Sequence, residues 1–280
     1  MDEVNGERFR DLAPGEICAI LLDEGRYLCS ERTMYYLLKK NQQTVVRYQS
    51  TPHVYSKPEL LATRPNELWS WDITKLKGPS RWMYYFLYVL MDVYSRYVVG
   101  WMLAHEESGK LAEALIADTY MRQNIVPGSL TVHSDNGPPM RCLLVAELMS
   151  NLGVSKTHSR PHVSNDNPFS EALFKTVKYD PEYPDRFSSI EHGHEFSDPF
   201  FKWYNYEHRH SGIAMLTPAM VHFGEAPKII ANRELVMAQA FERHPERFVK
   251  GLPKVEQLPK AVYINPPLPQ PPPKIIVCGS

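Results

Sequence analysis

Two short segments near the amino terminus carry apolar side chains at a helical spacing. The first runs over Pro14–Glu24 and the second over Glu31–Lys40, where Ser30 stands in a position to cap the helix. A turn that contains Gly25 separates them, so the pattern predicts a helix-turn-helix. Because any helical hairpin gives a similar pattern, the spacing alone leaves DNA binding and simple packing open.

The pattern changes at Leu68. Three consecutive runs rich in aromatic and β-branched residues predict strands at Leu68–Leu76, Met83–Asp92 and Tyr97–Leu103. Helices are then predicted at Gly109–Gln123, Met140–Leu152 and Pro168–Lys178, alternating with strands at Leu130–His133 and Val154–His158. Three adjacent strands followed by alternating elements predict an α/β fold, a mixed sheet flanked by helices.

These patterns divide the chain into four parts. We predict a helix-turn-helix-like unit over residues 1–45, a linker over 46–66, a core over 67–225 and a basic, proline-rich tail over 226–280. Helical patterning continues over Glu225–Phe248. The stretch Pro266–Pro273 is predicted to be extended, because so many prolines cannot form a packed core.

Composition and charge narrow the class of protein only slightly. No run of eighteen apolar residues and no apolar signal core is present, which predicts a cytoplasmic protein with no membrane partner. The four cysteines are scattered and include no CxxC pair, so neither a disulfide framework nor a cysteine-based zinc site is indicated. The net charge of −1 neither favours nor excludes DNA, and only residues 226–280 are basic, with 8 Lys and Arg against 4 Asp and Glu.

Two aspartates stand in settings that suggest chemistry. Asp72 lies in the aromatic run from Trp69 to Thr74, where a carboxylate is costly to desolvate unless a cation compensates it. Asp135 follows the strand predicted to end at His133, and Gly137 after it allows a sharp turn. Since ligands gather at the strand ends of α/β sheets, the position of Asp135 favours a binding site.

Glu171 falls in the first turn of the helix predicted over Pro168–Lys178, which Asn167 can cap. One stripe of this helix is apolar, comprising Phe169, Ala172, Leu173, Thr176 and Val177. The opposite face carries Glu171, Lys175 and Lys178. The two lysines are candidates for holding a DNA backbone, although Lys175 with Glu171 is equally consistent with a helix pair of a few tenths of a kcal/mol.

Three convergent acids would suit a site for two Mg²⁺ ions, with Mn²⁺ as a substitute, because phosphoryl transfer on a diester needs metals more than covalent help. Any single acid among the 32 in this chain is more often a solvated surface residue. We interpret Asp92, Asp118 and Asp166 as surface acids or caps of that kind. Spacing alone therefore makes Asp72, Asp135 and Glu171 plausible and no more.

Five strings in order resemble the core of retroviral-integrase-like transposases of the bacterial IS-three group. They are WSWDITKL, YVLMDVYSRYVVGW, HSDNG, NDNPFSEALFKTVKY and YNYEHRHSGIAMLTPAMVHFG, within residues 69–224. The 35 residues between Asp135 and Glu171 match the D-35-E spacing of that family. The amino-terminal unit resembles the helix-turn-helix that precedes the core in this group, and the tail motif His244–Phe248 is similar too.

The resemblance implies a ribonuclease-H-like fold and a DDE transposase. Asp72, Asp135 and Glu171 would be the catalytic and metal-binding acids, with two ions present when DNA is bound. DNA-contacting residues would be Lys175, Lys178, Arg32, Lys39 and Lys40. The implied partner is double-stranded DNA, both element ends and target, on which the protein would act as a homo-oligomer in the bacterial nucleoid.

Further downstream, His208 and His210 match a family signature, and we interpret them as structural or DNA-proximal, because no third or fourth ligand for zinc is evident. The His-His-Cys-Cys domain that precedes retroviral integrase cores has no match here. The chain is similar to a downstream reading-frame product, which implies an upstream-frame DNA-binding partner. A non-catalytic DNA-binding product and a plain nuclease of the same fold stay open as alternatives.

Overall fold

The protein is described by a computed structural model covering residues 8–9, 12–40, 60–135, 137, 139–158 and 167–264. Asp166, most of the predicted linker and the stretch Pro266–Pro273 lie outside the described residues. The predicted elements of the core are present, mostly with ends that shift by one or two residues. The helix predicted over Met140–Leu152 is shorter: a 3₁₀ turn spans Pro139–Arg141, and α4 spans Leu143–Asn151.

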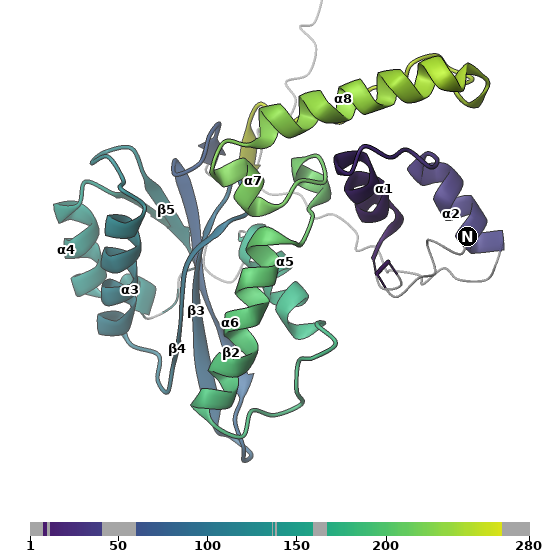
Figure 1. Cartoon of the computed structure of the whole chain (residues 1–280). Coiled ribbons are helices and arrows are strands. Elements are labelled where there is room, and N and C mark those ends of the chain that lie inside the picture. Colours follow the sequence, from purple (N-terminus) through teal and green to yellow (C-terminus); the bar gives the residue numbers. More distant parts are fainter. Residues whose placement is uncertain are drawn as a thin grey trace, which may run out of the picture.

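A five-stranded mixed sheet forms the centre of the molecule (Figure 1). Its strand order is β4-β3-β2-β5-β6, with bounds β2 Leu68–Lys77, β3 Tyr84–Asp92, β4 Val98–Ala104, β5 Thr131–Ser134 and β6 Ser155–His158. The first three strands pair antiparallel, whereas β5 and β6 run parallel to β2. This arrangement confirms the predicted ribonuclease-H-like α/β class.

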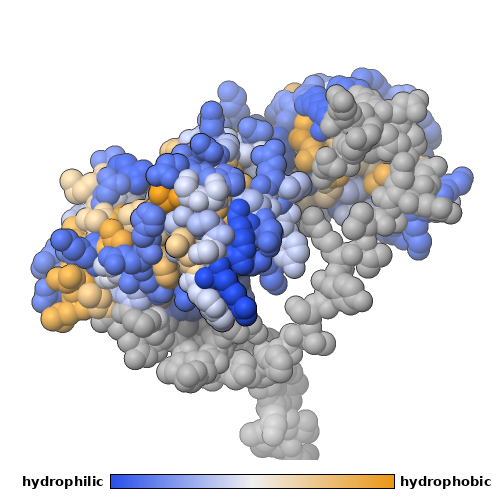
Figure 2. Space-filling view, turned by 90° about the horizontal axis from the view of Figure 1, so that it is seen from below, coloured by the Kyte–Doolittle hydropathy of each residue, from blue (hydrophilic) through white to orange (hydrophobic). Residues whose placement is uncertain are grey.

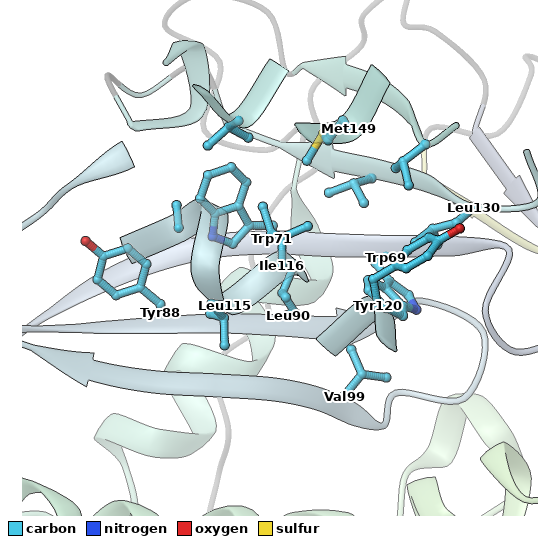
Figure 3. Close-up of a cluster of buried hydrophobic side chains, with 14 of the residues drawn as sticks. Trp69, Trp71, Tyr88, Leu90, Val99, Leu115, Ile116, Tyr120, Leu130 and Met149 are labelled. Carbon is cyan, nitrogen blue, oxygen red and sulfur yellow. The ribbon is translucent and has the colours of Figure 1, made fainter. Parts of the chain in front are cut away.

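One face of the sheet is covered by α3 (Gly109–Arg122) and α4, on the left in Figure 1. Odd-numbered residues of β2 point to this side, so that Trp69 and Trp71 are fully buried against Ile116 and Met149 (Figure 3). Because side chains alternate along a strand, the even-numbered residues of β2 face the other layer. Burial of the two indoles locks the register of β2, and with it the direction of Asp72.

The other face is covered by α5 (Pro168–Lys178) and α6 (Ile190–Tyr206). Leu173 and Val177 of α5 and Phe200 and Phe201 of α6 are buried against Leu87 and other side chains of the sheet. The predicted apolar stripe of α5 is therefore partly wrong. Ala172 is exposed, and Phe174 and Ser170 are buried in its place.

Both ends of the described core join in a structure that the sequence pattern did not predict. Strand β1 (Leu60–Ala62) lies within the predicted linker 46–66, and it pairs antiparallel with β7 (Val262–Ile264) of the predicted tail. Two further helices, α7 (Pro218–His222) at the end of the predicted core and α8 (Ala226–Arg243) after it, pack near this pair. Ile264 and Ala62 are fully buried, so the tail contributes to the hydrophobic core as far as residue 264.

The predicted amino-terminal helix pair is present as α1 (Pro14–Asp23) and α2 (Glu31–Lys40). Ser30 caps α2 as predicted, with its hydroxyl accepting a hydrogen bond from the backbone N–H of Thr33 at 3.3 Å. Figure 1 shows α8 extending from the core over this pair. Arg233 of α8 is buried and donates to Asp23 of α1, which fixes the pair against the core.

The interpretation of Asp92 as a surface acid is wrong, because its side chain is fully buried. Its Oδ1 accepts from the backbone N–H and the hydroxyl of Ser95 at 2.7 and 2.6 Å, and its Oδ2 accepts from the N–H of Asn66 at 2.7 Å. The Ser95 hydroxyl in turn lies 3.0 Å from Nδ1 of His222 in α7. Asp92 thus caps the turn between β3 and β4 and ties it to α7.

The surface agrees with an ordinary globular fold on the side shown in Figure 2. Apolar residues there form small groups separated by hydrophilic ones. Exposed Asp118 pairs with Arg122 at 2.8 Å, consistent with its interpretation as a surface acid. Of the helices that the structure describes, none is both long enough and apolar enough to span a bilayer.

Candidate active site

The strand pairing places the two predicted aspartates on neighbouring strands. Trp71 of β2 is paired with Ser134 of β5 in the parallel ladder, and Asp72 and Asp135 each follow by one residue. Positions in register on parallel strands point to the same face. Both carboxylates therefore belong to the α5 side of the sheet, and both are partly exposed.

Glu171 reaches this region because the start of α5 is fastened to β2. The Ser70 hydroxyl, fully buried, donates to Oδ1 of Asn167 at 2.5 Å. The Ser70 Oγ also lies 2.5 Å from the Ser170 Oγ. Ser170 is the donor of this hydrogen bond, because the single O–H of Ser70 already donates to Asn167. Asn167 Nδ2 donates to the carbonyl of Trp71 at 3.3 Å. This network holds the first turn of α5 beside Asp72.

The predicted capping role of Asn167 is therefore only half right. Asn167 occupies the position before the helix, but its side chain makes no capping hydrogen bond. It is fully buried and turns to β2 instead. A buried amide must satisfy both its N–H and C=O groups, and the sheet offers partners for both. The residue thus joins helix to strand where the sequence suggested only a local cap.

The charges of two acids and one lysine act on Asp72. Burial raises the pKa of Asp72 from 3.8 to about 7, and the charge of Asp135 contributes next, followed by that of Glu171. A hydrogen bond from the backbone N–H of Ile73 and the charge of Lys178 lower the pKa of Asp72 and oppose this rise. With a pKa near 7, Asp72 is protonated to a substantial extent at neutral pH, and a cation bound beside it would favour the carboxylate.

The site fits a divalent cation in its chemistry. Carboxylate oxygens are the ligands that Mg²⁺ prefers, and a cation would relieve the mutual repulsion of the acids. Their side chains do not stand in a coordination sphere: among the residues that the structure describes, no three His, Cys, Asp or Glu side chains are grouped closely enough to hold an ion. Residues 159–166, which lead into α5, are outside that part of the chain.

The predicted DNA-contacting residues fall into two groups. Lys175 and Lys178 are exposed on α5, on the same side as Glu171, and the charge of Lys178 reaches Asp72. Arg32, Lys39 and Lys40 are exposed on α2, away from the carboxylates. The structure therefore brings Lys178 to the acid cluster and leaves the α2 residues on a separate unit.

The two histidines of the downstream signature are packed among aromatic rings. Their ring centroids are 4.5 Å apart in an edge-on arrangement, and both contact Tyr204. Burial lowers the pKa of His210 well below 6.5, so this ring is neutral. His208 Nδ1 lies 3.6 Å from Glu16 of α1. These contacts are those of packing residues and agree with the structural interpretation.

A residue that sequence reasoning missed supports α5 from outside the acid cluster. Arg96, in the turn before β4, lies over the ring of Phe169 at 3.9 Å and donates to the carbonyl of Val93. Desolvation lowers the pKa of this guanidinium to about 10, which leaves it charged at neutral pH. The signal was present in the sequence, since Arg96 lies within the string YVLMDVYSRYVVGW, but only the fold brings it to Phe169.

Two protein-family models, both described as "Integrase core domain", match the sequence of this chain, one over residues 62–164 and the other over 152–218. Together they span residues 62–218, more than half of the 280 residues. The matched region contains the five strands of the sheet, α3 to α6 and all three acids.

Curated relatives carry transposase names. The transposase for insertion sequence element IS904 of Lactococcus lactis is 27% identical over 172 residues, 58% of this chain and 66% of that protein. Putative transposase InsK for IS150 of Escherichia coli is 27% identical over 171 residues, 61% of this chain and 59% of that protein. Transposase InsF for IS3A of the same organism is 28% identical over 134 residues, which make up 48% of this chain and 45% of that protein. The chain thus spans about half to two thirds of the length of these relatives.

Among solved structures, the catalytic core domain of HTLV-2 integrase in complex with magnesium covers 57% of this chain and 97% of its own, at 16% identity and a TM-score of 0.43. The catalytic core domain of BIV integrase covers 58% and 97%, at 19% identity and a TM-score of 0.42. These similarities are too low to carry an argument about the site.

Proposed function

Because the chain belongs to the transposases with an integrase-like core, we propose that it is a metal-dependent polynucleotidyl transferase. It cuts DNA at the ends of an insertion sequence and joins the resulting 3′-hydroxyl to a second position in DNA. This proposal is supported by two observations: Asp72 and Asp135 follow paired positions of neighbouring parallel strands, and the charges of Asp135 and Glu171 both act on Asp72.

The three acids are the residues that would hold divalent metal, with Asp72 and Asp135 on one ion and Asp72 and Glu171 on a second. Mg²⁺, or Mn²⁺ in its place, would supply an activated attacking oxygen and stabilise the leaving one. Asp72 contributes its carboxylate only after losing the proton that burial favours. Binding of metal should therefore release a proton near neutral pH.

The remaining residues of the site position these groups. Ser70, Asn167 and Ser170 fasten the first turn of α5, so that Glu171 keeps its place relative to Asp72. Lys175 and Lys178 lie on the exposed face of α5, where their ammonium groups can hold the phosphate backbone of a DNA end. On DNA, the protein is expected to form a multimer that brings two element ends together. An upstream-frame DNA-binding product is expected to complete the recognition of these ends.

The test uses labelled duplexes that carry the element ends, with Mg²⁺ present. Wild type should nick the duplex and then transfer the strand, and Asp135→Asn should do neither. Asp118→Asn is the matched control, since Asp118 is an exposed acid that pairs with Arg122 on its own helix. Equal nicking by wild type and Asp135→Asn would defeat the assignment of the acids. Hydrolysis without strand joining would identify a nuclease instead.

A further inference from the structure

A cavity of about 250 Å³ lies between the amino-terminal helix pair and the far end of α8. The turn that joins α1 to α2 supplies one wall, with Arg26 and Tyr27. The other wall comes from the end of α8 and the residues after it, with Arg243 and Arg247. More than two hundred residues separate the two walls along the chain, and Figure 1 shows α8 reaching over the helix pair to meet it.

No acidic side chain is among the described residues that line this cavity, and the neighbouring Glu246 lies 3.2 Å from His244. Three arginines line the cavity, and all three are exposed. Arg243 uses its Nε–H for the carbonyl of Gln239 at 3.2 Å, which engages one of the five N–H donors of the guanidinium. Glu24, next to the turn, is paired with Arg8, so its charge is already compensated. A cavity lined in this way favours an anion.

The guanidinium groups of these arginines indicate which anion the cavity would bind. Their planar fork of donors matches a phosphate bidentately, and several of them around one space can hold the same group. The ring of Tyr27 stacks on that of Phe248, with centroids 5.4 Å apart, and this joins the two walls of the cavity. The volume of about 250 Å³ admits a phosphate with its ester oxygens.

We propose that this cavity binds a phosphate of the DNA backbone, and that the end of α8 and the α1–α2 turn form one DNA-contacting surface. The inference rests on the proposed function for the identity of the partner. The second helix of the pair, α2, exposes Arg32, Lys39 and Lys40 on the same unit. In helix-turn-helix proteins, the residues around the recognition helix hold the backbone and orient that helix.

The attachment of the helix pair to the core makes such a joint surface possible. Asp23, the last residue of α1, accepts hydrogen bonds from Arg233 of α8 at 2.7 and 3.2 Å. It also pairs with Arg209 at 2.6 Å. Because α8 carries both Arg233 and Arg243, the ion pair that holds the helix pair also sets where the arginines of the cavity stand. The DNA-contacting unit therefore includes a helix from the far end of the chain.

The test measures affinity for a fluorescent duplex by anisotropy at several salt concentrations, using the whole chain. The double variant Arg243→Gln/Arg247→Gln is compared with Lys228→Gln/Lys254→Gln. Both remove two positive charges from exposed positions of the same region, and neither lysine lines the cavity. A phosphate contact contributes about −0.9 to the slope of log K against log salt. We expect the arginine variant to lose between about 1 and 2 units of slope and roughly tenfold or more in affinity at about 0.1 M salt.

The lysine variant should keep the wild-type slope of log K against log salt. Arg26→Gln, which changes the other wall of the cavity, should make this slope less steep. Equal losses in the two double variants would overturn the phosphate site, and so would an unchanged slope for the arginine variant. A third measurement follows the melting temperature in inorganic phosphate. Stabilisation by low millimolar phosphate, lost in the arginine variant while its DNA slope stays that of wild type, would show a site for the free anion and refute the DNA contact.

These outcomes are separable from those of the proposed function. A chain that nicks DNA normally but shows no arginine-dependent slope contradicts the cavity proposal alone. A chain that never nicks DNA, yet shows the arginine-dependent slope, contradicts the catalytic proposal and supports the phosphate site.

Discussion

Asp23 attaches the helix pair to the core through two arginines, so Asp23→Asn is a change for which the structure predicts a clear loss of stability. Asp23 contacts two arginines that are themselves out of solvent: the side chain of Arg233 is 3% exposed and that of Arg209 is 10% exposed. Asparagine keeps the shape of the side chain and one oxygen acceptor, but it removes the negative charge. Two guanidinium groups would then share a buried site, and the counter-charge left on α1 would be that of Glu16, which acts on Arg209 less strongly than Asp23 does.

The size of the loss follows from burial. Breaking a buried ion pair by removing one partner costs about 3–5 kcal/mol. Arg233 keeps its hydrogen bonds to the carbonyls of Ala214 and Met215, at 2.6 and 3.0 Å. Because these contacts and the asparagine oxygen still satisfy part of the guanidinium, we expect the low end, about 3 kcal/mol.

Asp118→Asn is the matched control. Asp118 pairs with Arg122 at 2.8 Å, a distance close to that of the Asp23 pairs, but the two side chains are 64% and 55% exposed. Exposed pairs of this kind contribute roughly 0.2–1 kcal/mol. The same substitution at a similar distance should therefore cost several times less, because water already screens the charges.

Urea unfolding measures both losses, and hydrogen exchange locates them. In Asp23→Asn, exchange should accelerate in α1 and in α8 while β2 and β3 keep the protection of wild type, because the lost contact joins the helix pair to the core. Equal free-energy losses in the two variants would refute the argument from burial. Faster exchange spread over the whole sheet would show that Asp23 supports the core and not the attachment of the helix pair.

Three further predictions concern the site and the sheet. In EDTA, Asp72→Asn should be more stable than wild type by up to about 4 kcal/mol, and this gain should develop as the pH rises from about 4 to 7. The reason is that burial raises the pKa of Asp72 to about 7, so wild type loses stability as the pH rises through this window and the variant does not. Thermal melts of both proteins across this pH range check the prediction. Asn167→Ala should slow nicking in single-turnover assays without weakening DNA binding, because it frees α5 from the carbonyl of Trp71; a loss of binding alone would contradict this. Gly100→Ala should cost about 1–3 kcal/mol in urea unfolding, since its Cβ would lie 2.2 Å from the hydroxyl of Thr119, and Thr119→Ala should restore part of that loss.

Local patterns predicted most of the core before any contact was known. The boundaries of α5 are those read from Asn167-Pro168 and the periodicity that follows, and β2 was found from its run of aromatic and β-branched residues. These signals work because helix starts and strand propensities depend on neighbouring residues. The same reasoning gave no strand at Leu60–Ala62, because three residues are too few for a periodic signal and the pairing partner β7 lies about two hundred residues away.

The catalytic and DNA-contacting roles stay predictions. The positions of these residues in the fold nevertheless show which contacts a local sequence pattern cannot predict. The spacing of Asp135 and Glu171 pointed to a site, and the structure brings both charges to bear on Asp72. Asn167 was read as a cap, whereas its amide belongs to a network with Ser70 and Ser170. The difference arises because a cap is a local interaction, while a buried amide takes the partners that packing brings to it.

By itself, the sequence determined the order and type of the core elements, since these depend on residues near one another. It also made Asp72, Asp135 and Glu171 candidates, through motifs and a spacing that resemble those of a family. The tertiary structure alone decided which distant groups meet. Asp23 and Arg233 stand 210 residues apart, and the arginines of the cavity come from the turn after α1 and the end of α8. No period or spacing carries such a contact, because it exists only when the folded core has placed α8 against the amino-terminal helix pair.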